Sequence, residues 1–278
     1  MAILLVLFAF GLVFGSFLNV CIWRLPRHES LVTPGSHCPK CGAAIGPHDN
    51  IPVASYALLR GRCRRCGQRI SWVYPLVELV TGGIFAGCYA IFGPSAAAVK
   101  WILFCSIMLV LVFTDLRERI LPNSVNYSGL AAGLALSLLA APADGTAGWL
   151  LNGWFGLGAP GRLVGLADAA LGAAVAGGLL WLFAEGYFRL RGREGMGLGD
   201  VKMMAMAGAF LGVRQAILML LLGSILGSVA GAIVVWGMRK GTDYELPFGT
   251  FLGIAGLAIV FIGGPVLHWY GSVAGLGR

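Results

Sequence analysis

Two aspartates lie at the ends of segments that otherwise suit a lipid environment. Asp115 follows the apolar run 101–114, and Asp200 ends the tetrapeptide Gly197-Leu-Gly-Asp just before the mostly apolar run 201–213. An ionisable group near a bilayer is costly, so each aspartate marks a candidate functional site. Two carboxylates that share a proton can hydrolyse an amide, because the ionised one takes a proton from water while the protonated one polarises the carbonyl.

The glycines beside Asp200 fit a peptide substrate. Gly197 and Gly199 carry no side chain, so the backbone there could approach a substrate closely or adopt positive φ. Simpler interpretations stay open: Asp200 could favour the N-terminus of the next helix, and Asp115 could pair with Arg119 four residues on. An ion-coupled transporter would also use such carboxylates as a proton relay, although transporter sites usually lie at mid-membrane.

Four cysteines form a second set with chemical potential. They occur as two Cys-x-x-Cys pairs separated by 21 residues, with a glycine after each pair: Cys38, Cys41, Cys63 and Cys66. This spacing predicts a tetrathiolate zinc site, whose closed coordination shell would be structural. Two disulfides or free thiols are the alternatives, but disulfides rarely persist in the cytoplasm. In so small an insert, the metal would supply much of the folding energy.

The composition predicts the elements that carry these residues. The chain is 58% hydrophobic and only 12% charged, against roughly 25% charged in ordinary soluble domains. We therefore expect an all-α polytopic membrane protein with about eight transmembrane helices, one of which is short, at 200–213. Gly223, Gly227 and Gly231 have the four-residue spacing of close helix packing. The candidate spans are 2–22, 73–93, 97–115, 124–141, 164–188, 200–213, 215–237 and 248–270.

The basic residues predict the topology. Of 20 lysines and arginines, 15 fall in alternate connections between the candidate spans, which marks those connections as cytoplasmic. Basic residues follow rather than precede 2–22, so this segment is predicted to be a retained first span and not a signal peptide. No basic stripe with interleaved aromatics suggests nucleic-acid binding. The 15 residues are Arg24, Arg27, Lys40, Arg60, Arg62, Arg64, Arg65, Arg69, Arg117, Arg119, Arg189, Arg191, Arg193, Arg239 and Lys240.

This topology places Asp115 and Asp200 at the same, cytoplasmic face of the membrane. If they meet there, their mutual repulsion would leave one ionised and one protonated. The predicted organisation is a first transmembrane helix at 1–22, a small zinc-ribbon-like cytoplasmic insert at 23–72 and a transmembrane domain at 73–278. The outside loop 142–163 suggests no function.

The order of several short motifs resembles that of the bacterial type IV prepilin leader peptidases, which are bifunctional peptidase/N-methyltransferases of the GxGD aspartic protease group. No single motif is decisive, but their order together with the four cysteines is specific. The matching stretches are Gly15-Ser-Phe-Leu-Asn-Val20, Arg24-Leu-Pro26, Asn50-Ile-Pro-Val53, Tyr74-Pro-Leu-Val-Glu-Leu79, Asp115 through Leu121-Pro122, Gly195-Met-Gly-Leu-Gly-Asp-Val-Lys202 and Leu246-Pro-Phe-Gly249.

The resemblance implies roles for the matched positions. Asp115 and Asp200 would be the catalytic pair of a peptidase domain, and the cysteine insert would be the zinc module associated with methylation. The substrate would be a prepilin or pseudopilin, cut after a glycine at the cytoplasmic face of the bacterial inner membrane. The new N-terminal amine would then be methylated by S-adenosylmethionine. No Gly-x-Gly-x-x-Gly follows a predicted strand, so methylation rests on the resemblance, and a peptidase without it stays an alternative.

Two positions depart from the family pattern. Asn123 stands where aspartate is common, and Thr250 stands where proline is common. Neither change removes a proposed catalytic group, although Asn123 could alter the electrostatics near the aspartates. Lys202 is predicted either to hold the charge of Asp200 or to meet an acidic substrate, or else to extend to the membrane interface. Glu78 is predicted to contact the substrate or to pair with an arginine of the insert.

Overall fold

The computed structural model describes residues 1–142, 145–192, 196–237 and 246–273, and the regular secondary-structure elements there are helices. Within these ranges it has no β-strand, only two isolated β-bridges, which confirms the all-α prediction. Four residues used above, namely Arg193, Gly195, Arg239 and Lys240, lie outside these ranges. Chain contacts define two units, Met1–Ala98 and Val99–Arg278; the predicted boundaries at 22 and 72 stay predictions.

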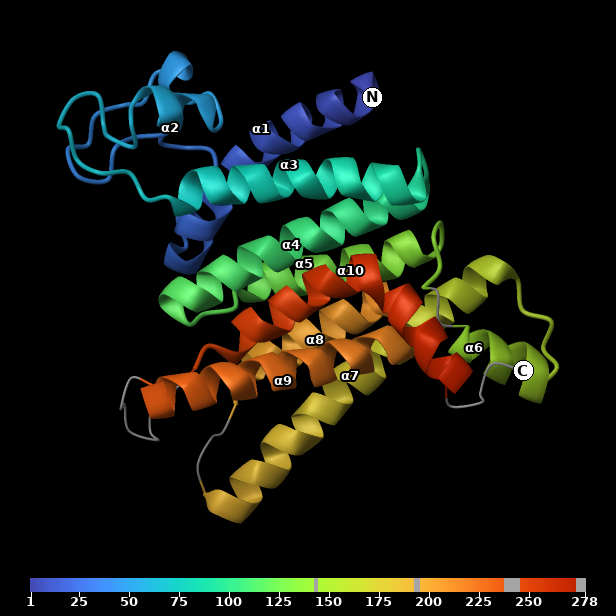
Figure 1. The fold of residues 1–278 in the computed structure, drawn as a ribbon. Helices are drawn as coiled ribbons and strands as arrows, with labels where there is room; N and C mark the ends of the chain where they lie inside the picture. Colours follow the sequence, from blue (N-terminus) through green and yellow to red (C-terminus); the bar gives the residue numbers. More distant parts are fainter. Residues whose placement is uncertain (143–144, 193–195, 238–245, 274–278) are drawn as a thin grey trace. The chain divides into compact units, whose positions relative to one another are not determined.

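The first unit is built on two long helices that pack side by side (Figure 1). Two glycines of the first helix set their close approach, because a Cβ at Gly11 would lie 2.7 Å from Gly82 Cα and one at Gly15 would lie 2.7 Å from Glu78 Cα. Between the two long helices the chain forms short helical turns and the cysteine loops. The elements are α1 (Ala2–Arg24), η1 (Leu25–Arg27), η2 (Pro47–Asp49), α2 (Ala54–Leu58) and α3 (Val73–Phe92).

Arg24 ties the start of the cysteine insert to the end of α1. It is 7% exposed, and its guanidinium donates to the carbonyl oxygens of Ser30 at 2.8 Å and Pro34 at 2.6 Å. A buried arginine is stabilised by such satisfied donors. Arg24 therefore has a structural role beyond the topology that its charge indicates.

The second unit is a bundle around one short helix, α8. The elements are α4 (Ala96–Glu118), α5 (Asn123–Ser137), α6 (Thr146–Gly148), the π-helical η3 (Trp149–Trp154), α7 (Gly161–Arg191), α8 (Leu198–Leu211), α9 (Val213–Gly237) and α10 (Phe248–Val273). Helices α5, α7, α9 and α10 pack against α8 (Figure 1), and Phe104 of α4 meets Phe210 with ring centroids 5.2 Å apart. Nine of the 14 residues of α8 are buried, so its apolar surface faces other helices.

The tightest crossing in this bundle is between α7 and α8. A Cβ at Gly172 would collide with the carbonyl oxygen of Gly208, and a Cβ at Gly208 would collide with that of Gly172. Only glycine at both positions permits this approach of the two backbones. The crossing therefore fixes the position of α8 and, with it, the start of α8 at Gly197-Leu-Gly-Asp.

Six helices in the described ranges are long and apolar enough to cross a membrane: α1, α3, α4, α7, α9 and α10. This indicates a multi-pass membrane protein. Helices form at all eight predicted positions, but α5 has 15 residues and α8 has 14, or about 22 and 21 Å at 1.5 Å per residue. The hydrocarbon core is about 30 Å thick, so the count of eight spans is not confirmed. Enclosure by neighbouring helices explains the short α8.

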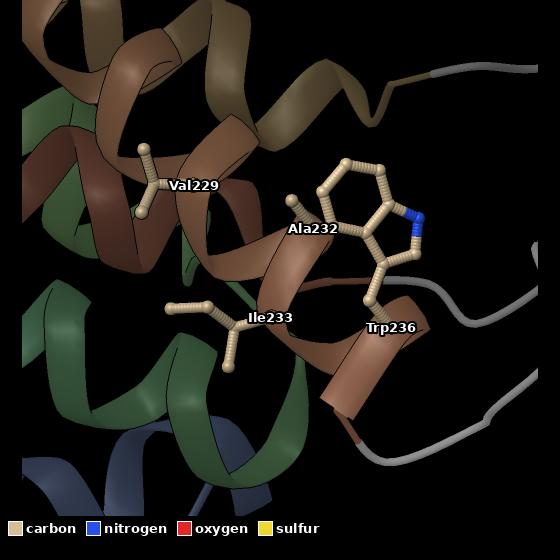
Figure 2. A pocket seen from close by; sticks show the side chains of 4 residues that line it. All are labelled: Val229, Ala232, Ile233 and Trp236. Carbon is tan, nitrogen blue, oxygen red and sulfur yellow. The ribbon is translucent and has the colours of Figure 1, made fainter.

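Helix α9 shows the predicted glycine packing on one side and an apolar surface elsewhere. A Cβ at Gly223 would lie 2.8 Å from Leu252 Cδ2 of α10, and one at Gly227 would lie 3.5 Å from Phe251. The glycine ladder thus faces α10. A shallow hollow on α9, lined only by apolar side chains, suits contact with lipid rather than chemistry (Figure 2); its lining residues are Val229, Ala232, Ile233 and Trp236.

Candidate active site and metal centre

Asp115 is buried near the end of α4 and accepts hydrogen bonds from the start of α10. It is 6% exposed, and its Oδ2 accepts two hydrogen bonds from Thr250, one from the backbone N–H at 2.6 Å and one from Oγ1 at 2.9 Å. Thr250 is the third residue of α10. The first four N–H groups of a helix have no partner within the helix, so this N–H is free to bind the carboxylate.

Asp200 is the third residue of α8, and Gly197 is the N-cap of that helix. The Asp200 side chain is buried, with 8% of the residue exposed, and its backbone N–H donates to Gly197 O at 3.1 Å. The partial positive charge of the helix N-terminus stabilises a carboxylate at this position. The helix-terminus interpretation of Asp200 therefore describes its local position, but it does not account for the proximity to Asp115.

Gly249 lies between the two aspartates. A Cβ there would lie 3.1 Å from Asp115 Oδ2, 3.1 Å from Asp200 Oδ1 and 2.9 Å from Leu121 Cδ1. Asp115 Oδ2 and Asp200 Oδ1 are thus no farther apart than twice 3.1 Å. Two carboxylates this close and this buried do not both ionise readily, since each charge opposes the other. The structure brings the predicted pair together around Gly249.

The two glycines of the Gly-Leu-Gly-Asp segment serve the start of α8. Gly197 has φ −76° and Gly199 is helical, so neither supplies the positive φ considered above. A Cβ at Gly199 would lie 3.1 Å from Leu121 Cβ, so this glycine lets α8 pack against that side chain. Gly249 and Thr250, which the sequence argument had given no role at the site, instead complete it. The sequence offered two signals for them: Gly249 ends the matched motif Leu246-Pro-Phe-Gly249, and Thr250 departs from the family pattern.

Lys202 forms a hydrogen bond with Asn123, one of the two residues that depart from the family pattern. Its Nζ donates to Asn123 Oδ1 at 2.9 Å and lies 5.5 Å from the centre of the Tyr127 ring. Lys202 therefore links α8 to the first turn of α5. An aspartate at position 123 would turn this hydrogen bond into an ion pair. The departure therefore replaces a charged partner of Lys202 by a neutral one and leaves the two buried aspartates in place.

The four cysteines of the insert converge. The Sγ atoms of Cys38, Cys41, Cys63 and Cys66 all lie within 4.8 Å of one another, and all seven cysteines of the chain are free thiols. Four thiolates at this separation match the donor set and geometry that zinc prefers. The residues therefore fit a metal ion, as the spacing predicts, and the two-disulfide alternative is not what the structure contains.

The two cysteine pairs form the same turn twice. In the first turn Cys38 N–H donates to Ala43 O and Gly42 N–H to Cys38 O, both at 2.9 Å. In the second, Cys63 and Gly67 make the corresponding bonds at 2.8 and 2.9 Å. Both glycines have φ +68°, a conformation that glycine adopts without strain. The glycine after each pair is thus required by the turn that presents the thiols.

Backbone donors also prepare one thiol for a metal. The N–H groups of Cys66 and Arg65 lower the pKa of the Cys63 thiol to about 6, whereas burial and hydrogen bonds with the other thiols raise the pKa of the Cys66 thiol to about 11. The thiolate is the form that binds a metal, so Cys63 is the thiol most ready to coordinate near neutral pH. His37 is not one of the residues whose ligand atoms converge, and its Nδ1 lies 3.0 Å from Gly35 O.

Glu78 joins the insert to α3. It is 8% exposed, and its Oε2 accepts a hydrogen bond from the Val53 N–H at 2.8 Å. Val53 has φ +59°, an unusual conformation for a β-branched residue. The expected arginine partner is thus replaced by a backbone N–H of the Asn50-Ile-Pro-Val53 motif, which places two matched motifs in contact within the first unit.

Comparison with known proteins agrees with this division of the chain. Residues 9–92 match the bacterial peptidase A24 N-terminal domain, and residues 102–232 match the type IV leader peptidase family. The first match contains the four cysteines and Glu78; the second contains Asp115 and Asp200. The chain belongs to the type IV leader peptidase family, and it is therefore an enzyme of the aspartic protease class.

Relatives of this family align over nearly the whole chain. A prepilin leader peptidase/N-methyltransferase of Burkholderia pseudomallei is 35% identical over 92% of this chain and 84% of its own length. Proteins of the same name from Aeromonas hydrophila and Bacillus subtilis are 32% and 30% identical, and the alignments cover 92% and 98% of their lengths. No solved structure matches the chain significantly.

Proposed function

We propose that the protein removes the basic leader of a type IV prepilin or pseudopilin through Asp115 and Asp200. One observation carries this proposal: two buried carboxylates from helices far apart in sequence lie on either side of Gly249. The family and the names of its relatives supply the substrate class. The basic connections between spans support cleavage at the cytoplasmic face of the inner membrane, and the family resemblance supports cleavage after a glycine.

The pair has the groups that amide hydrolysis needs. The ionised carboxylate takes a proton from water as the water oxygen attacks the scissile carbonyl carbon, while the protonated carboxyl donates a hydrogen bond to the carbonyl oxygen. When the tetrahedral intermediate collapses, the C–N bond breaks and the proton taken from water passes to the leaving amine. That amine becomes the new N-terminus of the pilin. Gly249 lets both carboxylates lie close to the start of α10, because a side chain at this position would crowd an oxygen of each.

Methylation of the new N-terminus by S-adenosylmethionine is the second proposed activity. It is supported by relatives named peptidase/N-methyltransferase along almost the full chain. The described residues contain no β-strand and so no strand–loop–helix nucleotide site; we assign no residue to the methyl donor. The relatives support neither a peptidase without methylation nor an ion-coupled transporter.

The four-cysteine cluster is proposed to hold a structural zinc ion. Four thiolates close the coordination shell, so the ion would leave no position for water or substrate. Zinc would join the two turns around Cys38 and Cys63 and supply folding energy to a segment with little secondary structure of its own. Helix α3 follows this segment directly, so the ion would also fix the entry to the membrane helix.

One experiment tests both proposed activities. The purified protein in lipid vesicles is incubated with a prepilin and S-adenosylmethionine, and the pilin N-terminus is read by mass spectrometry. We expect loss of the leader and gain of one methyl group. Leader loss without methylation would leave the peptidase and remove the second activity, and an intact leader would contradict the proposed function.

A further inference from the structure

Thr250 contacts Asp115 through two donors that the residue common at this position in the family does not have. The backbone N–H is 2.6 Å and Oγ1 is 2.9 Å from Asp115 Oδ2. Proline has neither a backbone N–H nor a hydroxyl group. Oγ1 is 3.4 Å from Val112 O, so the carboxylate is the closer acceptor for the hydroxyl. Thr250 is 4% exposed, which limits competition from water.

We propose that Thr250 is a positioning residue that makes Asp115 the ionised, water-activating member of the pair and leaves Asp200 as the protonated member that polarises the scissile carbonyl. This assignment rests on the proposed peptidase function. It goes further, because the pair alone does not say which aspartate acts as the base.

The contacts of the two aspartates favour the ionised form at Asp115 rather than at Asp200. Hydrogen bonds from neutral donors stabilise the charged form of a carboxylate, and two converge on one oxygen of Asp115. Each aspartate also lies near a helix N-terminus, α10 for Asp115 and α8 for Asp200, so these partial charges largely offset each other. The Asp200 carboxylate accepts one backbone hydrogen bond, from Gly197, whereas Asp115 accepts two from Thr250. The difference that remains is the additional donor, the hydroxyl group of Thr250.

Charged groups around the pair do not reverse this preference. From α8, Asp200 faces Asp115 and opposes a second charge. Directly after the end of α4, Arg119 lies close enough to act on Asp115 and favours its ionised form. Lys202 of α8 donates to Asn123, so its charge is held at the start of α5. With Asp115 ionised, repulsion keeps the proton on Asp200.

Three substitutions at Thr250 separate the two donors. T250S keeps both, T250V removes the hydroxyl while nearly keeping the volume, and T250P removes both. Proline is tolerated in the first turn of a helix because the N–H there has no helical partner, so T250P is expected to fold. The readout is the pH dependence of kcat/KM for leader cleavage, with thermal unfolding as a check on folding.

We expect the acidic limb of the cleavage profile to move to higher pH as donors are lost. T250S should keep the wild-type limb, T250V should shift it by about one pH unit, and T250P should shift it further. T81V is the matched control, because the buried hydroxyl of Thr81 donates within α3 to Val77 O; its limb should not move. An unmoved acidic limb in folded T250V and T250P would overturn the proposal, and a shift of the basic limb alone would reverse the assignment.

A second measurement does not depend on cleavage. In a D200N background Asp115 titrates without its partner, and the infrared band of its protonated carboxyl appears on acidification. In D200N/T250V this band should appear about one pH unit higher than in D200N, whereas T250V should not shift the Asp200 band in a D115N background. Equal midpoints in D200N and D200N/T250V would refute the role of Thr250, whether or not the wild-type protein cleaves a prepilin.

Discussion

At the scale of single residues, the chemistry of Asp115 and Asp200 depends on their immediate contacts. Each is almost fully buried, and burial strengthens every electrostatic interaction within the pair. Thr250 donates to one carboxylate, while the first turn of α8 surrounds the other. Asp115 is therefore influenced by a residue of another helix, whereas Asp200 is influenced by the start of its own helix.

Replacing either aspartate by asparagine should abolish leader cleavage without unfolding the protein. Asparagine keeps the shape of the side chain but can neither accept nor carry the proton, so we expect D115N and D200N each to lose at least about 10³-fold in rate. The initial rate of leader removal measures this loss. E185Q is the matched control, because Glu185 forms an exposed pair with Arg189 at 2.7 Å on α7. Wild-type rates in both aspartate variants would exclude the proposed pair.

Adding one methyl group at Gly249 should block the site. The new Cβ in G249A would lie 3.1 Å from an oxygen of each aspartate, so one or both carboxylates would have to shift. We expect a loss of about 10²-fold in kcat/KM, with a stability cost of about 1–3 kcal/mol from overpacking. G264A on the same helix is the control, since a Cβ there meets no atom within 4 Å. Equal activity of the two variants would show that cleavage does not depend on the absence of a side chain at position 249.

At the scale of secondary-structure elements, α8 matters because its neighbours decide where Asp200 lies. The helix is too short to span a bilayer alone, and its burial among α5, α7, α9 and α10 gives it a defined position. The contact of Gly172 with Gly208 is the closest part of that packing. A change there acts on the aspartate through the whole helix.

G208A should therefore impair both stability and cleavage. The added methyl would collide with the backbone of α7, and backbone cannot move aside as a flexible side chain can, so we expect at least about 1–3 kcal/mol of destabilisation. Thermal unfolding in detergent and the rate of leader removal give the two readouts. G178A on α7, where a Cβ meets no atom within 4 Å, should change neither. A G208A protein with wild-type stability would mean that this crossing is not tight in solution.

The cysteine insert makes a separate prediction. Serine does not supply a thiolate, so C38S and C63S should lose bound zinc, which elemental analysis of the purified protein measures. C88S is the control, because Cys88 is buried in α3 and lies outside the four-cysteine cluster. Zinc content that is the same in C38S, C63S and wild type would remove the tetrathiolate assignment.

At the scale of the whole molecule, two units carry two sets of functional groups. The cysteine cluster and Glu78 lie in Met1–Ala98, and the aspartate pair lies in Val99–Arg278. The two family matches, 9–92 and 102–232, follow the same division. Because each set is complete within its own unit, cleavage and the metal-dependent role of the insert can be separated by mutation.

The predicted orientation in the membrane can be tested at the two ends of α7. Leu157, before the helix, is 65% exposed, and Leu190, at its end, is 86% exposed. The distribution of arginines predicts that residue 190 faces the cytoplasm. A cysteine placed at position 157 should react with an impermeant maleimide in cells with a permeabilised outer membrane, whereas one at position 190 should react only after lysis. The reverse pattern would invert the topology.

Much of the chemistry could be predicted from the sequence because it depends on local patterns. The Cys-x-x-Cys spacing and the glycine after each pair specify a turn of a few residues, so each half of the candidate metal site could be predicted from neighbouring positions. The apolar runs predicted the helices, and Asp115 and Asp200 stood out because charges are rare in such runs. Span number was less certain, since the length of a run does not say whether lipid or protein covers it.

The tertiary structure decided what depends on contacts distant in sequence. Thr250 reaches Asp115 across 135 residues, Gly249 lies against both aspartates, and Val53 meets Glu78 only because α3 returns beside the insert. Local hydrophobic patterns say which face of a helix is buried but not which partner covers it. The sequence by itself therefore determined the reactive groups and their membrane setting. Only helix packing determined which groups surround each carboxylate, and hence which of the two is to act as the base.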